Sequence, residues 1–313
     1  MKRVLIIKTS SMGDVIHTLP ALTDAKKIFP DIQFDWVVEP GFAEIPQWHP
    51  AVNQVIKAPL RRWRKFPLQA LKQKEYSTFF HQLRAIEYDA VIDAQGLVKS
   101  AVITKLARGK NYGYHRSCSR GSIIGYIYQH SIKVDANVHA VEKIRALFAK
   151  ILNYAQPDSP ANYGISFPSN KKEKQIIFLH GTTWTTKHWP QSYWKELGFL
   201  AAQAGYQVLI PWGNEIEKNR AQNIRKFSEE KGVMLLPQVL PKLSLREIAQ
   251  LMGETVGCIA VDTGLAHIAA AMAVPTVSLY GPTNPRLTGA YGPHQIHLSV
   301  TAPCAAKNPN SFQ

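Results

Sequence analysis

An aspartate occupies the first loop of this chain, directly after a short apolar segment. Residues 3–9, RVLIIKT, predict a β-strand, and the loop SSMGD (10–14) leads from it into a helix. Gly13 allows a ligand to approach the backbone closely, but the loop has neither GxGxxG nor GKS/T, the patterns of common phosphate-binding loops. Asp14 lies at the helix start, where it is either the helix cap or a carboxylate directed at a ligand.

A second loop carries the groups that bind a diphosphate. HGTTWTTKHWP (180–190) follows a predicted strand and precedes a predicted helix. Thr182 and Thr183 offer hydroxyls and backbone N–H groups, and Lys187 offers a mobile cation, a combination that suits a diphosphate. The alternative is a polar surface loop, and for the threonines taken singly that alternative is favoured.

A third loop, VDTGLAH (261–267), joins a predicted buried strand to an alanine-rich helix. Gly264 permits close approach of a ligand, and the helix N-terminus supplies amide donors and the positive end of a dipole. Asp262 is placed to accept hydrogen bonds from sugar hydroxyls or to cap the helix, and the two roles are compatible. His267 is read first as a buried structural histidine.

A basic segment, RRWRK (61–65), places four cations around one indole. The whole chain carries 37 Lys and Arg against 22 Asp and Glu, a formal net charge of +15. This excess indicates an acidic partner such as nucleic acid, an anionic membrane surface or a phosphorylated substrate. Trp63 favours a partner that is also partly apolar, so nucleic acid and a phosphorylated glycolipid both stay open.

Predicted strands and helices alternate through both halves of the chain. The apolar segments that predict strands occupy residues 3–9, 32–40, 54–58, 88–96, 176–181, 206–213, 257–262 and 274–281. Between them we expect helices, among them a long polar helix over roughly 67–87 and one at 139–152 with an apolar face. Pro20 falls inside the first helical segment, which should therefore kink or begin irregularly there.

This alternation predicts parallel sheets with right-handed crossovers, arranged as two Rossmann-like α/β domains that face each other across a cleft. We place an acceptor-side domain at residues 1–155, a polar linker at 156–175 and a second domain at 176–313. Because ligands of open α/β sheets bind beyond the carboxyl ends of strands, the strand-to-helix loops are the expected site of the chemistry.

Composition excludes several classes of protein. With 313 residues, 45% of them hydrophobic, the chain is globular and long enough for two cores. No apolar run approaches the roughly 18 residues that span a bilayer, and the N-terminal run is too short for a signal peptide. Cys118, Cys258 and Cys304 are odd in number and lack metal-ligand spacing, which indicates free thiols in a reducing cytoplasm.

The order of the motifs resembles that of a known enzyme family. The motifs along the chain are KTSSMGDVIHTLPALTDA, RRWRK, YDAVIDAQGLVKSA, HAVEKIRALFAK, TTKHWP, PWG, LPKLSL and VDTGLAH. From the first strand to about Gly292 the chain is similar to the bacterial lipopolysaccharide heptosyltransferases, which are inverting glycosyltransferases of the GT-B fold. The opening loop and the DTGLAH form resemble the type I enzymes rather than type II.

The resemblance implies a reaction and its participants. It implies inverting transfer of L-glycero-D-manno-heptose from ADP-L-glycero-β-D-manno-heptose to a Kdo hydroxyl of Kdo–lipid A, in lipopolysaccharide inner-core biosynthesis. The first domain would bind the acceptor and the second ADP-heptose, with no cofactor, no metal and no nucleic acid. Such an enzyme would be cytoplasmic and peripheral, on an anionic membrane surface at the inner face of the inner membrane of a Gram-negative bacterium.

The resemblance also implies roles for individual residues. Asp14 matches the catalytic base of the family, and Lys187 matches a contact to the leaving group. The implied donor contacts are Thr182, Thr183, Lys187, Glu217, Asp262, Thr263, Gly264 and His267. The implied acceptor contacts are Arg61, Arg62, Arg64, Lys65 and Arg120.

Two segments depart from the family pattern, and two rival functions stay open. GT-B chains usually end with a helix that crosses back onto the first domain, whereas residues 301–313 have no helical period, so we expect that helix to be absent. YGYHRSCSRGS (112–122) also differs from the pattern. The rivals are a GT-B transferase with another donor or acceptor, and a basic nucleic-acid-binding protein, which would account for the net charge but not for Asp14.

Overall fold

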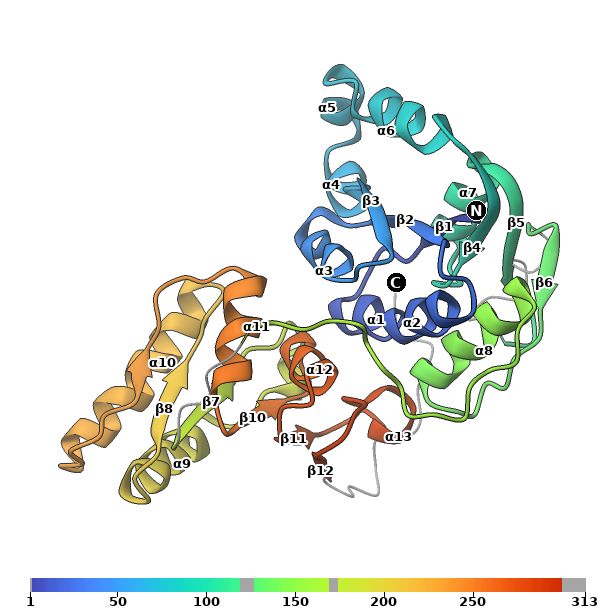
Figure 1. Cartoon of the computed structure of the whole chain (residues 1–313). Coiled ribbons are helices and arrows are strands. Elements are labelled where there is room, and N and C mark those ends of the chain that lie inside the picture. The colour runs from blue at the N-terminus through green and yellow to red at the C-terminus, as the bar shows by residue number, and fades with distance from the viewer. Residues whose placement is uncertain (1, 119–126, 169–173, 300–313) are drawn as a thin grey trace. The chain divides into compact units, whose positions relative to one another are not determined.

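The chain divides into two α/β units, Met1–Ser166 (unit 1) and Phe167–Gln313 (unit 2), each described by itself (Figure 1). The computed structural model describes residues 2–118, 127–168 and 174–299. The division falls inside the segment 156–175 that the sequence predicts as a linker. Residues 301–313, for which we expect no crossover helix, lie outside the described residues.

Unit 1 is built around a six-stranded parallel sheet with the order β3-β2-β1-β4-β5-β6. Its strands are β1 (Arg3–Ile7), β2 (Gln33–Val38), β3 (Val52–Lys57), β4 (Glu87–Asp93), β5 (Arg108–Tyr114) and β6 (His130–Ile132). Its helices are α1 (Met12–Ile16), α2 (Leu19–Ile28), η1 (Pro40–Phe42), α3 (Glu44–Gln47), α4 (Leu60–Lys65), α5 (Pro67–Lys72), α6 (Glu75–Arg84), α7 (Val98–Leu106) and α8 (Ala140–Leu152). The central strand β1 is buried from its second residue onward, as expected for a parallel strand covered on both faces.

Unit 2 contains a second six-stranded parallel sheet, with the order β12-β11-β10-β7-β8-β9. Its strands are β7 (Gln175–Leu179), β8 (Gln207–Ile210), β9 (Gln238–Val239), β10 (Gly257–Val261), β11 (Thr276–Tyr280) and β12 (Gln295–Ser299). Its helices are η3 (Thr185–Lys187), α9 (Gln191–Gln203), α10 (Glu215–Glu230), α11 (Leu245–Glu254), α12 (Gly264–Ala271) and α13 (Pro285–Thr288). Ser244 and Glu247 form a capping box at the start of α11.

The two sheets share one topology. When the strands of each unit are counted in chain order, both sheets read 3-2-1-4-5-6, the order of a Rossmann fold. The order reverses between β1 and β4 in unit 1 and between β7 and β10 in unit 2. Such switch points are where open α/β sheets bind ligands. The predicted α/β fold with two Rossmann-like domains is confirmed.

Two predicted helices are interrupted. The single helix predicted over 67–87 is wrong, because α5 and α6 are separated by a turn in which Lys74 has a left-handed φ of 56°. The segment after the opening loop also divides, into α1 and α2. Pro20 lies in the first turn of α2, where its missing N–H costs no helical hydrogen bond.

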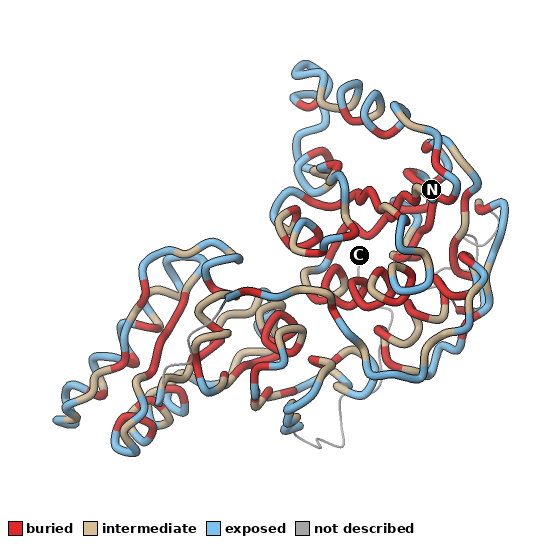
Figure 2. The backbone as a smooth tube through the Cα atoms, viewed as in Figure 1, coloured by how far each residue is buried: buried red, intermediate tan, exposed pale blue. Residues whose placement is uncertain are grey.

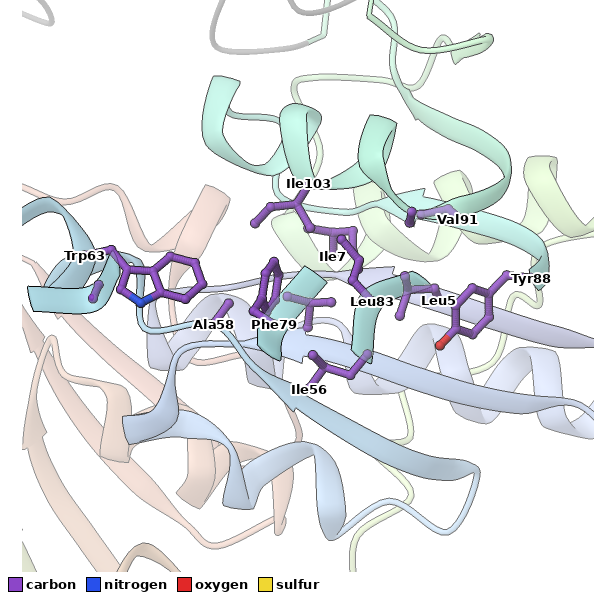
Figure 3. Packing of buried hydrophobic residues seen from close by; sticks show 13 residues of the cluster. Leu5, Ile7, Ile56, Ala58, Trp63, Phe79, Leu83, Tyr88, Val91 and Ile103 are labelled. Atoms are coloured by element: carbon purple, nitrogen blue, oxygen red, sulfur yellow. The ribbon is translucent and has the colours of Figure 1, made fainter. Parts of the chain in front are cut away.

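The apolar core of unit 1 fixes the basic helix α4 to the sheet. Trp63 from α4 lies beside Ala58 and Phe79 (Figure 3), and the rings of Trp63 and Phe79 have centroids 5.3 Å apart. Their neighbours in the core include Leu5 and Ile7 of β1. Burying a side chain such as Phe79 stabilises the fold by roughly 1.5–3 kcal/mol. The interpretation of Trp63 as a contact for a partly apolar partner is therefore wrong, because its indole is buried in the core and anchors the charged residues around it.

A buried ion pair joins α2 to α8 and holds the chain as it leaves α8. Arg145 Nε lies 2.6 Å from Asp24 Oδ2, and both side chains are 2% exposed. Arg145 Nη2 donates hydrogen bonds of 3.0 Å to the carbonyl oxygens of Pro157 and Ser159. One guanidinium thus fixes two helices and the first part of the predicted linker.

Burial follows the sheets in both units, whereas α5 and α6 carry mostly exposed residues (Figure 2). Among residues 2–118, 127–168 and 174–299, no helix is both long and apolar enough to cross a membrane. Within the same ranges, no three His, Cys, Asp or Glu side chains are grouped as metal ligands would be.

Candidate active site

Asp14 lies in the first turn of α1, just beyond the carboxyl end of β1. Ser11 is the N-cap residue, and Asp14 Oδ2 accepts 3.0 Å hydrogen bonds from the Ser11 backbone N–H and from its Oγ. The other oxygen, Oδ1, lies 3.2 Å from Lys8 Nζ, and the Asp14 side chain is 38% exposed. The interpretation of Asp14 as the N-cap is therefore wrong, because Asp14 is the N3 residue of a capping box whose N-cap is Ser11, and its carboxylate still faces solvent.

Lys8 fixes the charge of this carboxylate. Its side chain is 5% exposed, and Nζ also donates a 2.9 Å hydrogen bond to the Ala94 carbonyl. Burial by itself raises the pKa of the Asp14 carboxyl. The Lys8 ammonium, the hydrogen bonds from Ser11 and the charge of His17 outweigh burial and hold that pKa well below its ordinary value. Asp14 is therefore ionised at neutral pH.

A pocket of about 90 Å³ opens beside Asp14 at the switch point of unit 1. Gln95, which follows β4, ties that loop to the segment after β1, because Oε1 accepts hydrogen bonds from the backbone N–H groups of Thr9 (3.0 Å) and Ser10 (3.2 Å). The buried Asp93 carboxylate in turn accepts from the Gln95 N–H at 2.8 Å. The lining residues are Lys8, Asp14, Ala94, Gln95, Gly96, Tyr114, Cys118, Ala140, Lys143 and Ile144. The ionised carboxylate thus faces a small cavity with hydrogen-bonded walls.

A larger pocket, of about 560 Å³, lies along α4. Arg61, Arg64 and Lys65 line it from one face of the helix, as their i, i+3, i+4 spacing requires. Ser10 from the opening loop and Lys99 from α7 complete the polar lining. Four cations around one cavity favour an anionic ligand.

Arg62 faces away from the residues that line this pocket. Its Nη2 lies 2.8 Å from Glu75 Oε1 and donates a 2.7 Å hydrogen bond to Gln73. Glu75 also accepts a 2.9 Å hydrogen bond from the Trp63 indole. Arg62 therefore attaches α4 to residues 73–75, at the start of α6, instead of lining the pocket. Arg120, another predicted acceptor contact, lies outside the described residues.

The loops after β7 and β10 meet at the switch point of unit 2. Lys187 Nζ lies 2.7 Å from Oδ2 of Asp262, whose side chain is 7% exposed. Thr182 Oγ1 donates a 3.1 Å hydrogen bond to the Asp262 carbonyl. Thr183 is exposed on the same loop. The structure thus brings together three side chains that the sequence identifies in two separate loops.

Helix α12 begins directly after this ion pair. Thr263 is its N-cap residue and Gly264 its first residue, so the predicted capping role of Asp262 is wrong. The amide groups of the first turn and the positive end of the helix dipole favour an anion at this point. His267 lies in the first turn and is buried, as the structural interpretation of that histidine expects.

Glu217, predicted to lie near the donor, is in the first turn of α10. Its Oε2 accepts a 2.7 Å hydrogen bond from the Gly213 N–H, and its backbone N–H is capped by Asn214. A Cβ at Gly181 would lie 2.6 Å from Glu217 Cδ. The glycine after β7 therefore allows Glu217 to lie against the start of the loop that carries Thr182.

Arg220 follows on the same face of α10 and connects three segments of unit 2. Its Nη1 donates a 3.1 Å hydrogen bond to the His180 carbonyl and lies 3.4 Å from His188 Nδ1. Burial, together with the charge of Arg220, lowers the pKa of His180 to about 4, so this imidazole is neutral at pH 7. Arg220 thus fixes both ends of the loop 180–190 to α10.

The cations Lys8, Lys99 and Arg220 belong to these sites but are missing from the sequence prediction, as is Lys143 in the pocket beside Asp14. Lys8 precedes Asp14 by six residues, and its position at the end of an apolar strand was the available signal. Lys99 lies in QGLVKSA, just after another predicted strand. Arg220 is three residues after Glu217, a spacing that places both on one helix face.

The sequence matches one protein family over most of its length. The model of glycosyltransferase family 9 (heptosyltransferase) matches residues 76–311. The lipopolysaccharide heptosyltransferase 1 of Pseudomonas aeruginosa PAO1 is 48% identical over 97% of this chain and 85% of its own length. The name confirms the resemblance to the type I enzymes.

Solved structures agree with the sequence match. The Escherichia coli heptosyltransferase WaaC with ADP is 44% identical and superposes with a TM-score of 0.88 over 95% of this chain and 93% of its own. The same enzyme with ADP-2-deoxy-2-fluoro heptose gives a TM-score of 0.86 over 95% and 92%, again at 44% identity. The two α/β units therefore form a GT-B glycosyltransferase, and the chain belongs to glycosyltransferase family 9, the heptosyltransferases.

Proposed function

We propose that the chain transfers L-glycero-D-manno-heptose from ADP-L-glycero-β-D-manno-heptose to a Kdo hydroxyl of Kdo–lipid A, with inversion at the anomeric carbon. The relatives named lipopolysaccharide heptosyltransferase 1 support an acceptor from lipopolysaccharide synthesis. The E. coli complex with ADP-2-deoxy-2-fluoro heptose supports a nucleotide-heptose donor. The proposal includes no cofactor and no nucleic acid.

The observation that carries the proposal is the ionised, partly exposed Asp14 carboxylate at the edge of a pocket. Inversion in one displacement needs a base on the acceptor hydroxyl. Asp14 takes that proton while the hydroxyl oxygen bonds to the anomeric carbon, and the bond from this carbon to the phosphate oxygen of ADP breaks with its electron pair on ADP. Because its pKa is low, the carboxylate is a weak base, so we expect the proton to move late, when bond formation has made the hydroxyl acidic.

Unit 2 supplies the contacts to the donor in this proposal. Lys187, Thr182 and the N-terminus of α12 stabilise the charge that develops on the departing diphosphate. Thr183, Thr263, Gly264 and His267 are the further contacts that we assign to the donor, with Glu217 near its ribose. The diphosphate competes with Asp262 for the Lys187 ammonium, which frees Asp262 to accept from sugar hydroxyls.

Lysine and helix-dipole charge at this site lead us to propose transfer without a metal ion. Heptosyl transfer by the purified protein is expected to keep its rate in excess EDTA. A rate that falls on chelation and returns with a divalent cation would contradict this part of the proposal.

The basic pocket along α4 is the acceptor side of the proposal. Kdo carboxylates and lipid A phosphates are anionic, and Arg61, Arg64, Lys65 and Lys99 match them in charge. Arg62 contributes by holding α4, and Arg120 is assigned to the acceptor from the family pattern alone. Because the acceptor is a lipid, we place the protein at the cytoplasmic face of the inner membrane as a peripheral enzyme.

Mass spectrometry of Kdo–lipid A incubated with ADP-heptose and the protein tests the proposal. One added heptose is expected, and NMR of the product should show the anomeric configuration opposite to that of the donor. Asp14→Asn should lose roughly 10²–10⁴-fold in kcat, the contribution of a general base, with unchanged ADP affinity. An unchanged kcat in this variant would remove Asp14 from the mechanism, and an unmodified acceptor would refute the assigned substrate.

A further inference from the structure

Three large apolar side chains project from the short segment between α4 and α6. Phe66 is 46% exposed, Leu68 74% and Leu71 64%. Leu68 and Leu71 are three residues apart on α5 and therefore lie on one face of that helix. Single exposed apolar residues are ordinary, but three within six residues form a patch that needs a partner.

The charged residues in the chain around this patch are all basic. Residues 57–74 contain no Asp or Glu. They contain seven cations, which are Lys57, Arg61, Arg62, Arg64, Lys65, Lys72 and Lys74. The Lys65 ammonium lies 5.1 Å from the centroid of the Phe66 ring. Apolar and cationic groups are thus interleaved on one short segment, as in segments that lie in the interface of an anionic bilayer.

The patch is presented by a fixed support. On its N-terminal side the indole of Trp63 is buried in the core and bonded to Glu75, and on its C-terminal side Phe79 is buried in the same core. Ala70 is the buried residue of α5, which leaves Leu68 and Leu71 directed outward. The exposed run through α5 and α6 is visible in Figure 2.

We propose that Phe66, Leu68 and Leu71 form a docking tip that inserts into the interface of an anionic membrane, with Lys72 and Lys74 on the lipid headgroups. Charge complementarity identifies the partner, because a basic apolar segment without acids fits anionic lipid better than a protein surface of mixed charge. The inference deepens the proposed function, since the tip adjoins the basic pocket assigned to the lipid-linked acceptor. The pocket cations bind one acceptor, and the tip binds the bilayer around it.

Vesicle sedimentation tests the tip without any acceptor or donor. The full chain should bind vesicles of phosphatidylglycerol and phosphatidylcholine at least about tenfold more tightly than vesicles of phosphatidylcholine alone. The double variant Leu68→Asn/Leu71→Asn should lower binding to the anionic vesicles by about tenfold or more, because two leucine side chains no longer leave water. Wild-type protein that stays in the supernatant with anionic vesicles, or a double variant that binds as wild type does, would overturn the proposal.

A matched control separates the tip from general surface hydrophobicity. Leu200→Asn/Met234→Asn removes two exposed apolar side chains of unit 2, which are 50% and 101% exposed. This variant should bind vesicles as the wild type does. A loss equal to that of the tip variant would show non-specific adsorption and contradict the assignment. Thermal unfolding of both variants should match the wild type, since all four side chains are exposed.

The charged part of the proposal has its own test. Lys72→Gln/Lys74→Gln should weaken binding to anionic vesicles by about ten- to thirtyfold and leave binding to neutral vesicles unchanged. Equal binding of variant and wild type to anionic vesicles would remove these lysines from the docking surface.

Activity assays distinguish failure of the tip from failure of the assigned function. On an acceptor without acyl chains, the Leu68→Asn/Leu71→Asn variant should keep the wild-type kcat/KM, and on the same acceptor in vesicles it should lose about tenfold. If the wild-type protein is inactive on both acceptors, the assigned substrate is refuted, whereas the vesicle-binding result still stands. Equal losses of the variant on both acceptors would place these leucines in the fold or the acceptor pocket instead.

Discussion

At the scale of single residues, each switch point holds an ion pair with one buried and one more exposed partner. In unit 1 Lys8 is 5% exposed and Asp14 38%, and in unit 2 Asp262 is 7% exposed and Lys187 23%. In each unit the more exposed partner is the one that we assign to the reacting groups, Asp14 to the acceptor hydroxyl and Lys187 to the diphosphate. The signs are reversed between the units, as a base on one substrate and a cation on the other require.

Lys8 should set the acid limb of the pH–rate profile. In kcat/KM this limb reports the base of the free enzyme, so the wild-type limb is expected below the ordinary Asp pKa of about 3.9. Lys8→Met removes the opposite charge and should move the limb up by roughly 1–3 pH units, whereas Lys8→Arg should largely keep it low. Circular dichroism at each pH checks that the fold persists. A limb that stays in place in Lys8→Met would show that Asp14 is not the titrating base.

Arg220 should affect donor binding by positioning the loop 180–190. In Arg220→Met the hydrogen bond to the His180 carbonyl is lost, and we expect KM for ADP-heptose to rise by about tenfold, with a smaller effect on the KM of the acceptor. Arg225→Met, on the same helix, is the matched control because its guanidinium bonds to the Pro237 carbonyl instead. Equal effects of the two substitutions would indicate a general loss of α10 stability.

At the scale of elements, the side chains of the short helix α4 point in three directions and have three separate roles. Arg61, Arg64 and Lys65 line the pocket, Trp63 enters the core, and Arg62 pairs with Glu75. The last two contacts hold the first three residues in place. A helix of six residues has little stability of its own, so its position depends on these tertiary contacts.

Glu75→Ala should therefore loosen α4 without touching the pocket. The variant leaves the indole N–H of Trp63 without its acceptor, and we expect the free energy of unfolding to fall by roughly 1–3 kcal/mol and the acceptor KM to rise. Urea unfolding measures the first effect. Glu87→Ala is the control, since Glu87 is 73% exposed and its pair with Arg108 lies at the surface; that change should stay within about 0.5 kcal/mol. A stability loss equal to that of the control would show that Glu75 does not hold the helix.

At the scale of the whole molecule, the alternation of apolar and polar segments was enough to predict eight of the twelve strands that the structure describes and the loops that follow them. The four missed strands, β5, β6, β9 and β12, lie toward the edges of the two sheets. Asp14, Lys187 and Asp262 could be identified because strand ends are visible in the sequence. The direction of Arg62 could not, because it depends on Glu75, thirteen residues along and beyond a turn. That turn was missed because nothing in the composition of 67–87 marks Lys74 for a left-handed conformation.

The buried pair between Arg145 and Asp24 should carry a large share of the stability of unit 1. Arg145→Met leaves the Asp24 carboxylate buried without its partner, which should cost roughly 3–5 kcal/mol in the free energy of unfolding. Lys150→Met on the same helix should cost far less, because its amine bonds only to an exposed carbonyl. Calorimetry that shows equal transition temperatures for the two variants would contradict this assignment.

The hydrogen bonds from Arg145 to the carbonyls of Pro157 and Ser159 also decide where the gene can be divided. The two units are contiguous in the chain, and in the part that the structure describes every strand pairing lies within one unit, which suits them to expression as separate polypeptides. A break placed at residue 155, at the start of the predicted linker, would detach the two carbonyls that this guanidinium binds. An expression fragment for unit 1 should therefore extend past Ser159, and a chimera that exchanges unit 2 should have its junction after that residue.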